Sequence, residues 1–173
     1  MSIQQMLFSF EGRIRRRDWW LWNIAIGVGA FLLFEGLGYA LVGPQATSFG
    51  GVTTSGFTNT YSPELLVSIF ARAALTIWPV LALAVKRGHD RDMATAVTVG
   101  LFLASMALGW AVMLLPVLAP GIEPMAAVAV TGMAGLIGLV INLFLLVVFG
   151  FLDGTKGPNR YGPSPKGHAG QAV

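Results

Sequence analysis

The sequence contains no cysteine, and only 11% of its 173 residues are charged. Without cysteine the protein has no disulfide, no thiolate nucleophile and no thiolate metal site. Soluble domains carry about 25% charged residues. The low charge, with 55% hydrophobic residues and a mean hydropathy of +0.70, therefore predicts an integral membrane protein. The length predicts one membrane domain without a separate soluble domain.

Four hydrophobic runs are long enough to cross the hydrocarbon core of a bilayer, which takes about 20 helical residues. The predicted fold class is all-α: a polytopic membrane protein with four transmembrane helices. The first run exceeds the secretory h-region of about 7–15 residues, so we expect an uncleaved span, with cleavage near Ala40 as the alternative. The expected spans cover about residues 19–42, 65–85, 94–118 and 125–152.

Lysine and arginine are missing from the loops after the first and third runs. They gather before the first run, in the charged heptad 86–92 between the second and third runs, and in the Gly/Pro-rich tail. Short loops rich in Lys and Arg stay in the cytoplasm, so both termini are predicted to be cytoplasmic. The expected segments are a basic N-terminal segment (1–18), the four-helix transmembrane domain (19–152) and the tail (153–173).

The first twelve residues predict a short helix ahead of the first span. Ser2 and Gln5 have the spacing of a capping box, in which each side chain bonds the other residue's backbone. The helix is expected either to lie in the membrane interface or to pack on the protein's own underside. Its apolar face, at helical spacing, consists of Ile3, Met6, Leu7 and Phe10.

Two charged residues lie within the predicted spans, Glu35 in the first and Arg72 in the second. A charge within a span costs several kcal/mol unless it is paired or hydrated. Both residues are expected at a similar depth on consecutive antiparallel helices, so a direct pair is plausible. The pair is interpreted first as a structural bridge between the two spans, and alternatively as part of a path for an ion or small solute.

Basic and polar residues on the expected cytoplasmic face are candidates for binding anionic lipid or a protein partner. Lys and Arg beside a membrane attract anionic headgroups, by about 1 kcal/mol each. The alternatives are a mutually neutralising network with nearby carboxylates, and a specific phosphorylated ligand held by the planar donors of arginine. The candidates are Arg13, Arg15, Arg16, Arg17, Lys86, Arg87, Asn159, Arg160 and Tyr161.

His89 and Asp90 are the loop residues best suited to chemistry. A metal site needs three or four converging ligands, and the other histidine, His168, lies in the tail. We therefore expect no metal and no other cofactor. Asp90 and Asp92 are expected to pair with neighbouring arginines, and Asp92 to cap the N-terminus of the third span.

Three motifs occur in order, separated by the hydrophobic runs. Residues 10–20 read Phe-Glu-Gly-Arg-Ile-Arg-Arg-Arg-Asp-Trp-Trp, and residues 86–90 read Lys-Arg-Gly-His-Asp. Residues 157–165 read Gly-Pro-Asn-Arg-Tyr-Gly-Pro-Ser-Pro. Together they resemble the patterns F-x-G-R-x-x-R, basic-x-His-Asp and G-x-N-R-Y-G-x-x-P of the domain of unknown function 805 family, small bacterial inner-membrane proteins of the YhaH-like type. The middle motif departs from the pattern, because Gly88 stands where a bulky apolar residue is expected.

The resemblance implies a multi-pass protein of the bacterial plasma (inner) membrane without an established activity. The leading hypothesis is a non-enzymatic membrane module whose basic cytoplasmic face binds anionic lipid or a partner protein, with a homo-oligomer as a further option and no nucleic acid partner. A small transporter or channel using Glu35 and Arg72 is the first alternative. An enzyme that acts on lipid or phosphate through His89 or Asp90 is the second.

Overall fold

The computed structural model describes residues 2–36, 63–119 and 121–166, without the side chains of residues 35, 63–66, 116 and 117. These residues form helices joined by turns, and their one β-type pairing is an isolated bridge between Asn159 and Gly162. The predicted all-α class is confirmed. The elements are α1 (Ile3–Phe8), α2 (Arg16–Phe31), the π-helical turn η1 (Leu32–Gly36), α4 (Pro63–Asp90), α5 (Thr95–Leu118), α6 (Pro124–Leu146) and the π-helical turn η3 (Val147–Phe151).

Three of the described helices are long and apolar enough to cross a membrane: Val67–Asp90, Thr95–Leu115 and Pro124–Phe151. Their large apolar side chains are mostly exposed, as expected for helices that face lipid. The predicted first span, 19–42, coincides with α2 and η1 as far as residue 36, and the remainder lies outside the described residues.

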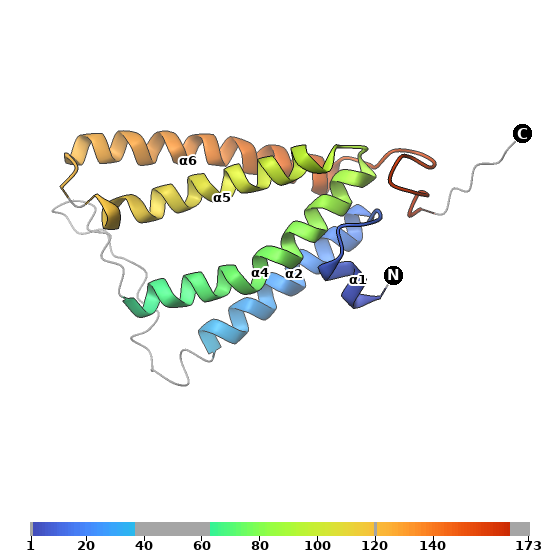
Figure 1. Ribbon diagram of the computed structural model, residues 1–173, viewed down its shortest axis with the longest axis horizontal. Coiled ribbons are helices and arrows are strands. Elements are labelled where there is room, and N and C mark those ends of the chain that lie inside the picture. Colours follow the sequence, from blue (N-terminus) through green and yellow to red (C-terminus); the bar gives the residue numbers. More distant parts are fainter. Residues whose placement is uncertain (1, 37–62, 120, 167–173) are drawn as a thin grey trace, which may run out of the picture.

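The helices form two pairs, α2 with α4 and α5 with α6. The pairs diverge toward one end of the molecule and meet at the other, where α1, the α4–α5 connection and the tail also lie (Figure 1). A small apolar core of Ala84, Leu145, Val148 and Phe149 holds this end together. The three charged segments therefore surround the point where the helix pairs are joined.

The capping box predicted at the N-terminus is present. The Gln5 amide donates to the Ser2 hydroxyl and the Ser2 amide donates to the Gln5 side chain, so α1 begins at Ile3. This helix packs against α4 while Ile3 and Phe8 stay 64% and 60% exposed. One face of α1 thus contacts the protein, and apolar side chains remain on its outer surface.

Helix α4 continues through the charged motif to Asp90, so His89 and Asp90 occupy its last turn rather than a loop. It ends in a Schellman motif, in which the Met93 amide donates to the Gly88 carbonyl and the Asp92 amide to that of His89. Asp92 has a φ of 58°, a left-handed conformation that aspartate tolerates. The expectation that Asp92 caps the next helix is wrong: Asp92 lies in the turn that follows α4, and Ala94 is the N-cap residue of α5.

Candidate functional site

Asp90 is the centre of a buried charge cluster that consists of Arg13, Lys86, Arg87, His89 and Asp90. Arg13 donates from Nε and Nη2 to Oδ1 of Asp90, at 3.1 and 2.9 Å. Arg87 donates from Nη1 to Oδ2. The side chains of both arginines are 1% exposed and that of Asp90 is 4% exposed. One carboxylate therefore faces two guanidinium groups, and one positive charge is left for other acceptors.

The remaining donors of Arg13 point at backbone carbonyls of the tail. Nη1 donates to Gly157 at 2.9 Å and to Gly162 at 3.2 Å, and Nη2 donates to Thr155 at 2.8 Å. Gly157 and Gly162 have φ values of 74° and 120°, a region that favours glycine and that curves the tail around the guanidinium. Arg13 therefore ties the N-terminal segment to both α4 and the tail.

Arg87 binds the end of the last apolar helix. Its Nε donates to the Phe149 carbonyl at 2.7 Å and its Nη2 to the Leu152 carbonyl. The last carbonyls of a helix lack partners within the helix and carry partial negative charge. The positive charge of Arg87 compensates these carbonyls. They in turn accept the hydrogen bonds of Arg87 that Asp90 does not.

Lys86 binds the carbonyls at the end of α1, as Arg87 binds those at the end of the last apolar helix. Its ammonium group donates to the carbonyls of Gln5 at 2.6 Å, Met6 at 2.8 Å and Ser9. An ammonium group has three donors, and all three are used on carbonyls at the C-terminal end of α1. Lys86 is fully buried, so it holds α1 against α4.

The tail is also fixed directly on the end of α4. The Thr155 amide donates to the Asp90 carbonyl at 2.7 Å, and the Asn159 side-chain amide donates to the His89 carbonyl at 2.8 Å. Gly154 lies so close that a Cβ atom there would overlap the Asp90 carboxylate. Only glycine at this position lets the chain pass the carboxylate without displacing it.

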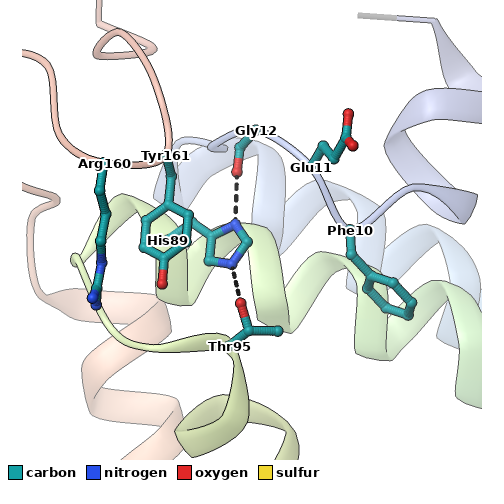
Figure 2. Close-up of a pocket in the computed structure, with 7 residues that line it drawn as sticks. All are labelled: Phe10, Glu11, Gly12, His89, Thr95, Arg160 and Tyr161. Atoms are coloured by element: carbon teal, nitrogen blue, oxygen red, sulfur yellow. Dashed lines mark hydrogen bonds between the residues drawn. The ribbon is translucent and has the colours of Figure 1, made fainter.

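His89 is held by three segments (Figure 2). Its Nδ1 lies 3.2 Å from the Gly12 carbonyl and its Nε2 lies 2.8 Å from the Thr95 hydroxyl. Because a carbonyl only accepts, Nδ1 carries the proton, and in the neutral ring Nε2 accepts from Thr95. The Tyr161 ring stacks on the imidazole with 3.7 Å between ring centroids. Both ring nitrogens are therefore engaged within the protein.

A pocket of about 540 Å³ lies beside this stack. Arg160 reaches over the Tyr161 ring, 4.9 Å from its centroid, and its Nε lies 3.1 Å from Oδ1 of Asp92. Glu11 lies on the other side of the stack (Figure 2). The lining residues are Phe10, Glu11, Gly12, His89, Thr95, Arg160 and Tyr161.

The other cations at this end form a basic rim, which is exposed or half-exposed. Arg16 and Arg17 have side chains 50% and 74% exposed, and each lies near one aspartate. The hydrogen bond from Lys166 and the nearby charge of Arg16 hold the pKa of Asp153 below its usual range. The cations outnumber the exposed or half-exposed carboxylates Glu11, Asp18, Asp92 and Asp153. The rim consists of Arg15, Arg16, Arg17, Arg91, Lys156, Arg160 and Lys166.

The structure thus divides the residues singled out in the sequence. Arg13, Lys86, Arg87, His89 and Asp90 come together in the interior, Asn159 and Tyr161 pack on them, and Arg15, Arg16, Arg17 and Arg160 lie in the rim. Within the described part of the chain, no group of His, Asp and Glu side chains is arranged to hold a metal ion.

Of the pair predicted between Glu35 and Arg72, the structure describes only the arginine side chain. Arg72 lies in α4, with its guanidinium carbon 5.5 Å from the centroid of the Phe34 ring in η1. The Glu35 side chain lies outside the described residues.

Sequence reasoning did not identify Thr95, Gly154 and Thr155 as parts of this region, and it included Glu11 only among the carboxylates that could neutralise the basic residues. Gly154 and Thr155 precede the tail motif directly, which is a weak signal that they share its surroundings. Glu11 occupies a variable position of the first motif, and Thr95 lies outside all three. Nothing in their own neighbourhood marks them, because their partners are far away in the sequence: 65 residues separate Thr155 from Asp90.

Residues 7–163 match the family described as "Protein of unknown function (DUF805)". The chain belongs to this family. Uncharacterized protein YiiR of Escherichia coli strain K12 is 32% identical over 164 residues, which cover 94% of this chain and 89% of YiiR. YiiR of Escherichia coli O157:H7 has the same identity and coverage. No solved structure matches the chain.

Membership of the DUF805 family confirms the resemblance inferred from the three motifs. The matched range includes every residue of the buried charge cluster and every residue that lines the pocket. The motifs that identify this DUF805 protein are therefore the segments that meet at the end of α4. Their contacts give the motifs a structural role at the junction of the helices.

Proposed function

We propose that the protein is a non-enzymatic, four-span protein of the bacterial inner membrane, with both termini in the cytoplasm, whose basic rim binds anionic lipid headgroups. The observation that carries this proposal is the division of the cations into two groups. Arg13, Lys86 and Arg87 are buried and directed at protein acceptors. The rim cations remain at the surface and outnumber the carboxylates there, so the rim has an excess of positive charge that attracts anionic headgroups.

The four-span topology is supported by the meeting of both chain ends. Arg13, which precedes the first apolar helix, donates to tail residues that follow the last one. Two segments in contact lie on one side of a membrane, which supports an even number of crossings. The Lys- and Arg-rich ends favour the cytoplasmic side.

The topology is tested in a chain that has no cysteine of its own. Single variants Ser2→Cys and Ser164→Cys are expected to resist a membrane-impermeant maleimide in intact cells, and Gly121→Cys, between α5 and α6, to react. Labelling of Ser2→Cys and Ser164→Cys from opposite sides would contradict an even number of spans.

The geometry gives little support to an enzyme built on His89 or Asp90. Both oxygens of Asp90 accept from arginine, and both nitrogens of His89 are engaged. An acid–base group needs an open path to the proton that it transfers. These side chains instead position the surrounding segments.

Lipid binding is tested in nanodiscs that contain phosphatidylglycerol, by native mass spectrometry of the released protein. Arg16→Gln/Arg17→Gln is expected to retain less phosphatidylglycerol than the unmodified protein, because about 1 kcal/mol is lost per cation removed near the surface. Asp18→Asn is the matched control, since it changes one charge in the same segment without removing a cation of the rim, and it is expected to retain at least as much phosphatidylglycerol. Equal retention by the double variant and the unmodified protein would refute binding by the rim.

A further inference from the structure

The polarity of α1 changes along its axis. The cap and first turn, residues 2–5, read Ser-Ile-Gln-Gln, and the remainder of the helix, residues 6–8, reads Met-Leu-Phe. The last of these residues, Phe8, is 60% exposed. A helix that lies flat on a membrane has an apolar stripe along its whole length. The polarity of α1 suits instead an inclined helix whose C-terminal end enters an apolar phase.

Contacts with α4 place this C-terminal end far from the charged end of the molecule. The indole N–H of Trp78 donates to the Phe8 carbonyl at 3.3 Å. Further along the N-terminal segment, Arg13 binds Asp90, the last residue of α4. Trp78 and Asp90 are twelve positions apart in α4, which is about 18 Å along a helix axis. The chain therefore reaches toward the middle of α4 at Phe8 and returns to the end of α4 at Arg13.

The surface around Phe8 is continuous with the exposed apolar surface of α4. Trp78 is 48% exposed, and Leu75, which lies on the same face of α4 three positions earlier, is 55% exposed. The Phe10 ring packs on Trp78, with 4.9 Å between ring centroids. Lipid that covers Leu75 and Trp78 on the outside of α4 therefore also meets Phe8.

The carbonyls at the C-terminal end of α1 already have donors from α4. The ammonium group of Lys86, which is fully buried, binds the carbonyls of Gln5, Met6 and Ser9. The indole of α4 binds that of Phe8. Water hydrates the last carbonyls of a helix that ends in water, whereas hydrocarbon supplies no donor and leaves such groups to the protein. This end of α1 is therefore prepared for an apolar medium, although Phe8 is exposed.

The N-terminal end of α1 suits the level of the lipid headgroups. It lies at the charged end of the molecule, near the α4–α5 connection and the tail (Figure 1). Ser2 and Gln5 satisfy each other's backbone amides, and Gln4 is exposed. The helix thus begins among polar groups and ends beside the apolar surface of α4.

We propose that α1 enters the cytoplasmic leaflet at an incline, so that acyl chains cover Phe8 and Trp78 while Ser2 and Gln4 stay among the headgroups. The partner of this surface is the acyl region of the bilayer. Insertion fixes the depth of the N-terminal segment, which carries Arg16 of the rim. The proposal rests on the membrane placement proposed above. It does not require the rim to bind anionic headgroups, because acyl chains carry no charge.

The test uses nitroxide spin labels on single cysteines, in a chain that has none of its own. The protein is reconstituted in vesicles of phosphatidylethanolamine and phosphatidylglycerol. Electron paramagnetic resonance then compares relaxation by oxygen, which concentrates in the acyl region, with relaxation by a water-soluble nickel chelate. Phe8→Cys is expected to be relaxed mainly by oxygen, like Leu139→Cys on the exposed surface of α6. Gln4→Cys, on the same helix as Phe8, is expected to be relaxed mainly by the nickel chelate.

Three results would overturn the proposal, each in a different way. Nickel relaxation of Phe8→Cys as strong as that of Gln4→Cys would place the whole helix outside the acyl region. Oxygen-dominated relaxation at both positions would mean that α1 lies flat and is not inclined. Weak relaxation of Phe8→Cys by both reagents would mean that a partner protein or a second copy covers it. Nickel access at Leu139→Cys would contradict the membrane placement itself, so the two failures are distinguishable.

Lys86→Met, introduced into the Phe8→Cys protein, tests the role of the carbonyl donors. Without the ammonium group the carbonyls at the end of α1 find donors only in water, so the nickel chelate is expected to relax the label more strongly. Lys166→Met is the matched control, because Lys166 pairs with Asp153 at the rim, and it is expected to leave the ratio of the two relaxation effects unchanged. An unchanged ratio in Lys86→Met would overturn the role given to this lysine.

Discussion

At the scale of single residues, burial decides which charges matter for stability. Asp90 accepts from Arg13 and Arg87 with all three side chains almost fully buried. Removing one partner of a buried pair typically costs about 3–5 kcal/mol, because a charge is left without compensation. Exposed pairs contribute about 0–1 kcal/mol, which applies to Arg160 and Asp92 at 55% and 47% exposure. Asp90 and Asp92, only two positions apart, are therefore expected to contribute very differently to the stability of the protein.

At Gly88 the structure leaves no room for a side chain. A Cβ atom on Gly88 would overlap the side chain of Thr98, which is buried on α5. The Thr98 hydroxyl has no hydrogen-bond partner in the described part of the protein. Thr98 therefore fills the volume that a larger residue at position 88 would need.

We expect Gly88→Ala to destabilise the protein by about 1–3 kcal/mol through overpacking. Adding Thr98→Ala removes the overlapping atoms and loses no hydrogen bond, so the double variant is expected to recover most of this loss. The measurement is the free energy of unfolding in detergent for the two single variants and the double variant. Gly100→Ala, where no atom lies within 4 Å of the added Cβ, is the matched control. Additive effects would show that Thr98 is not the obstacle.

At the scale of elements, α1 depends on one buried lysine. A helix of six residues is too short to be stable alone in water. The Lys86 ammonium binds three carbonyls at its end. The contacts that α1 makes with α4 therefore provide the stability that so short a helix lacks on its own.

We expect Lys86→Met to release α1, because methionine keeps the bulk of the side chain but has no donor. The measurement is the rate at which a thiol reagent modifies Met6→Cys, a half-buried position in a chain without native cysteine. The rate is expected to rise in Lys86→Met and to stay unchanged in Lys166→Met, where the lysine is exposed. An unchanged rate in Lys86→Met would mean that apolar contacts alone hold the helix.

The sequence predicts some elements well because their signals are local. Hydropathy alone predicts the helical class, and the spacing of Ser2 and Gln5 predicts the capping box. The extension of α4 through Lys86, Arg87 and Asp90 is not predicted, because the apolar run ends before the helix does. The partners of these residues lie up to 81 positions away in the chain, and such distant contacts leave no periodic pattern in the sequence.

At the scale of the whole molecule, the three family motifs meet where the helix pairs meet (Figure 1). Arg13 comes from the first motif, Arg87 and Asp90 from the second, and the carbonyls of Gly157 and Gly162 from the third. The assembled end carries both the basic rim and the pocket.

The measurement that tests the account most directly is the melting temperature of the protein in nanodiscs with and without phosphatidylglycerol. A lipid that binds the folded state raises the stability. We expect Arg16→Gln/Arg17→Gln to reduce the gain from phosphatidylglycerol, with little change in its absence. We expect Asp90→Asn to lower the melting temperature in both membranes by about the same amount, and to leave the gain intact. The opposite pattern, a full gain in the arginine double variant or no loss of stability in Asp90→Asn, would contradict the division into buried structural charges and exposed lipid-binding ones.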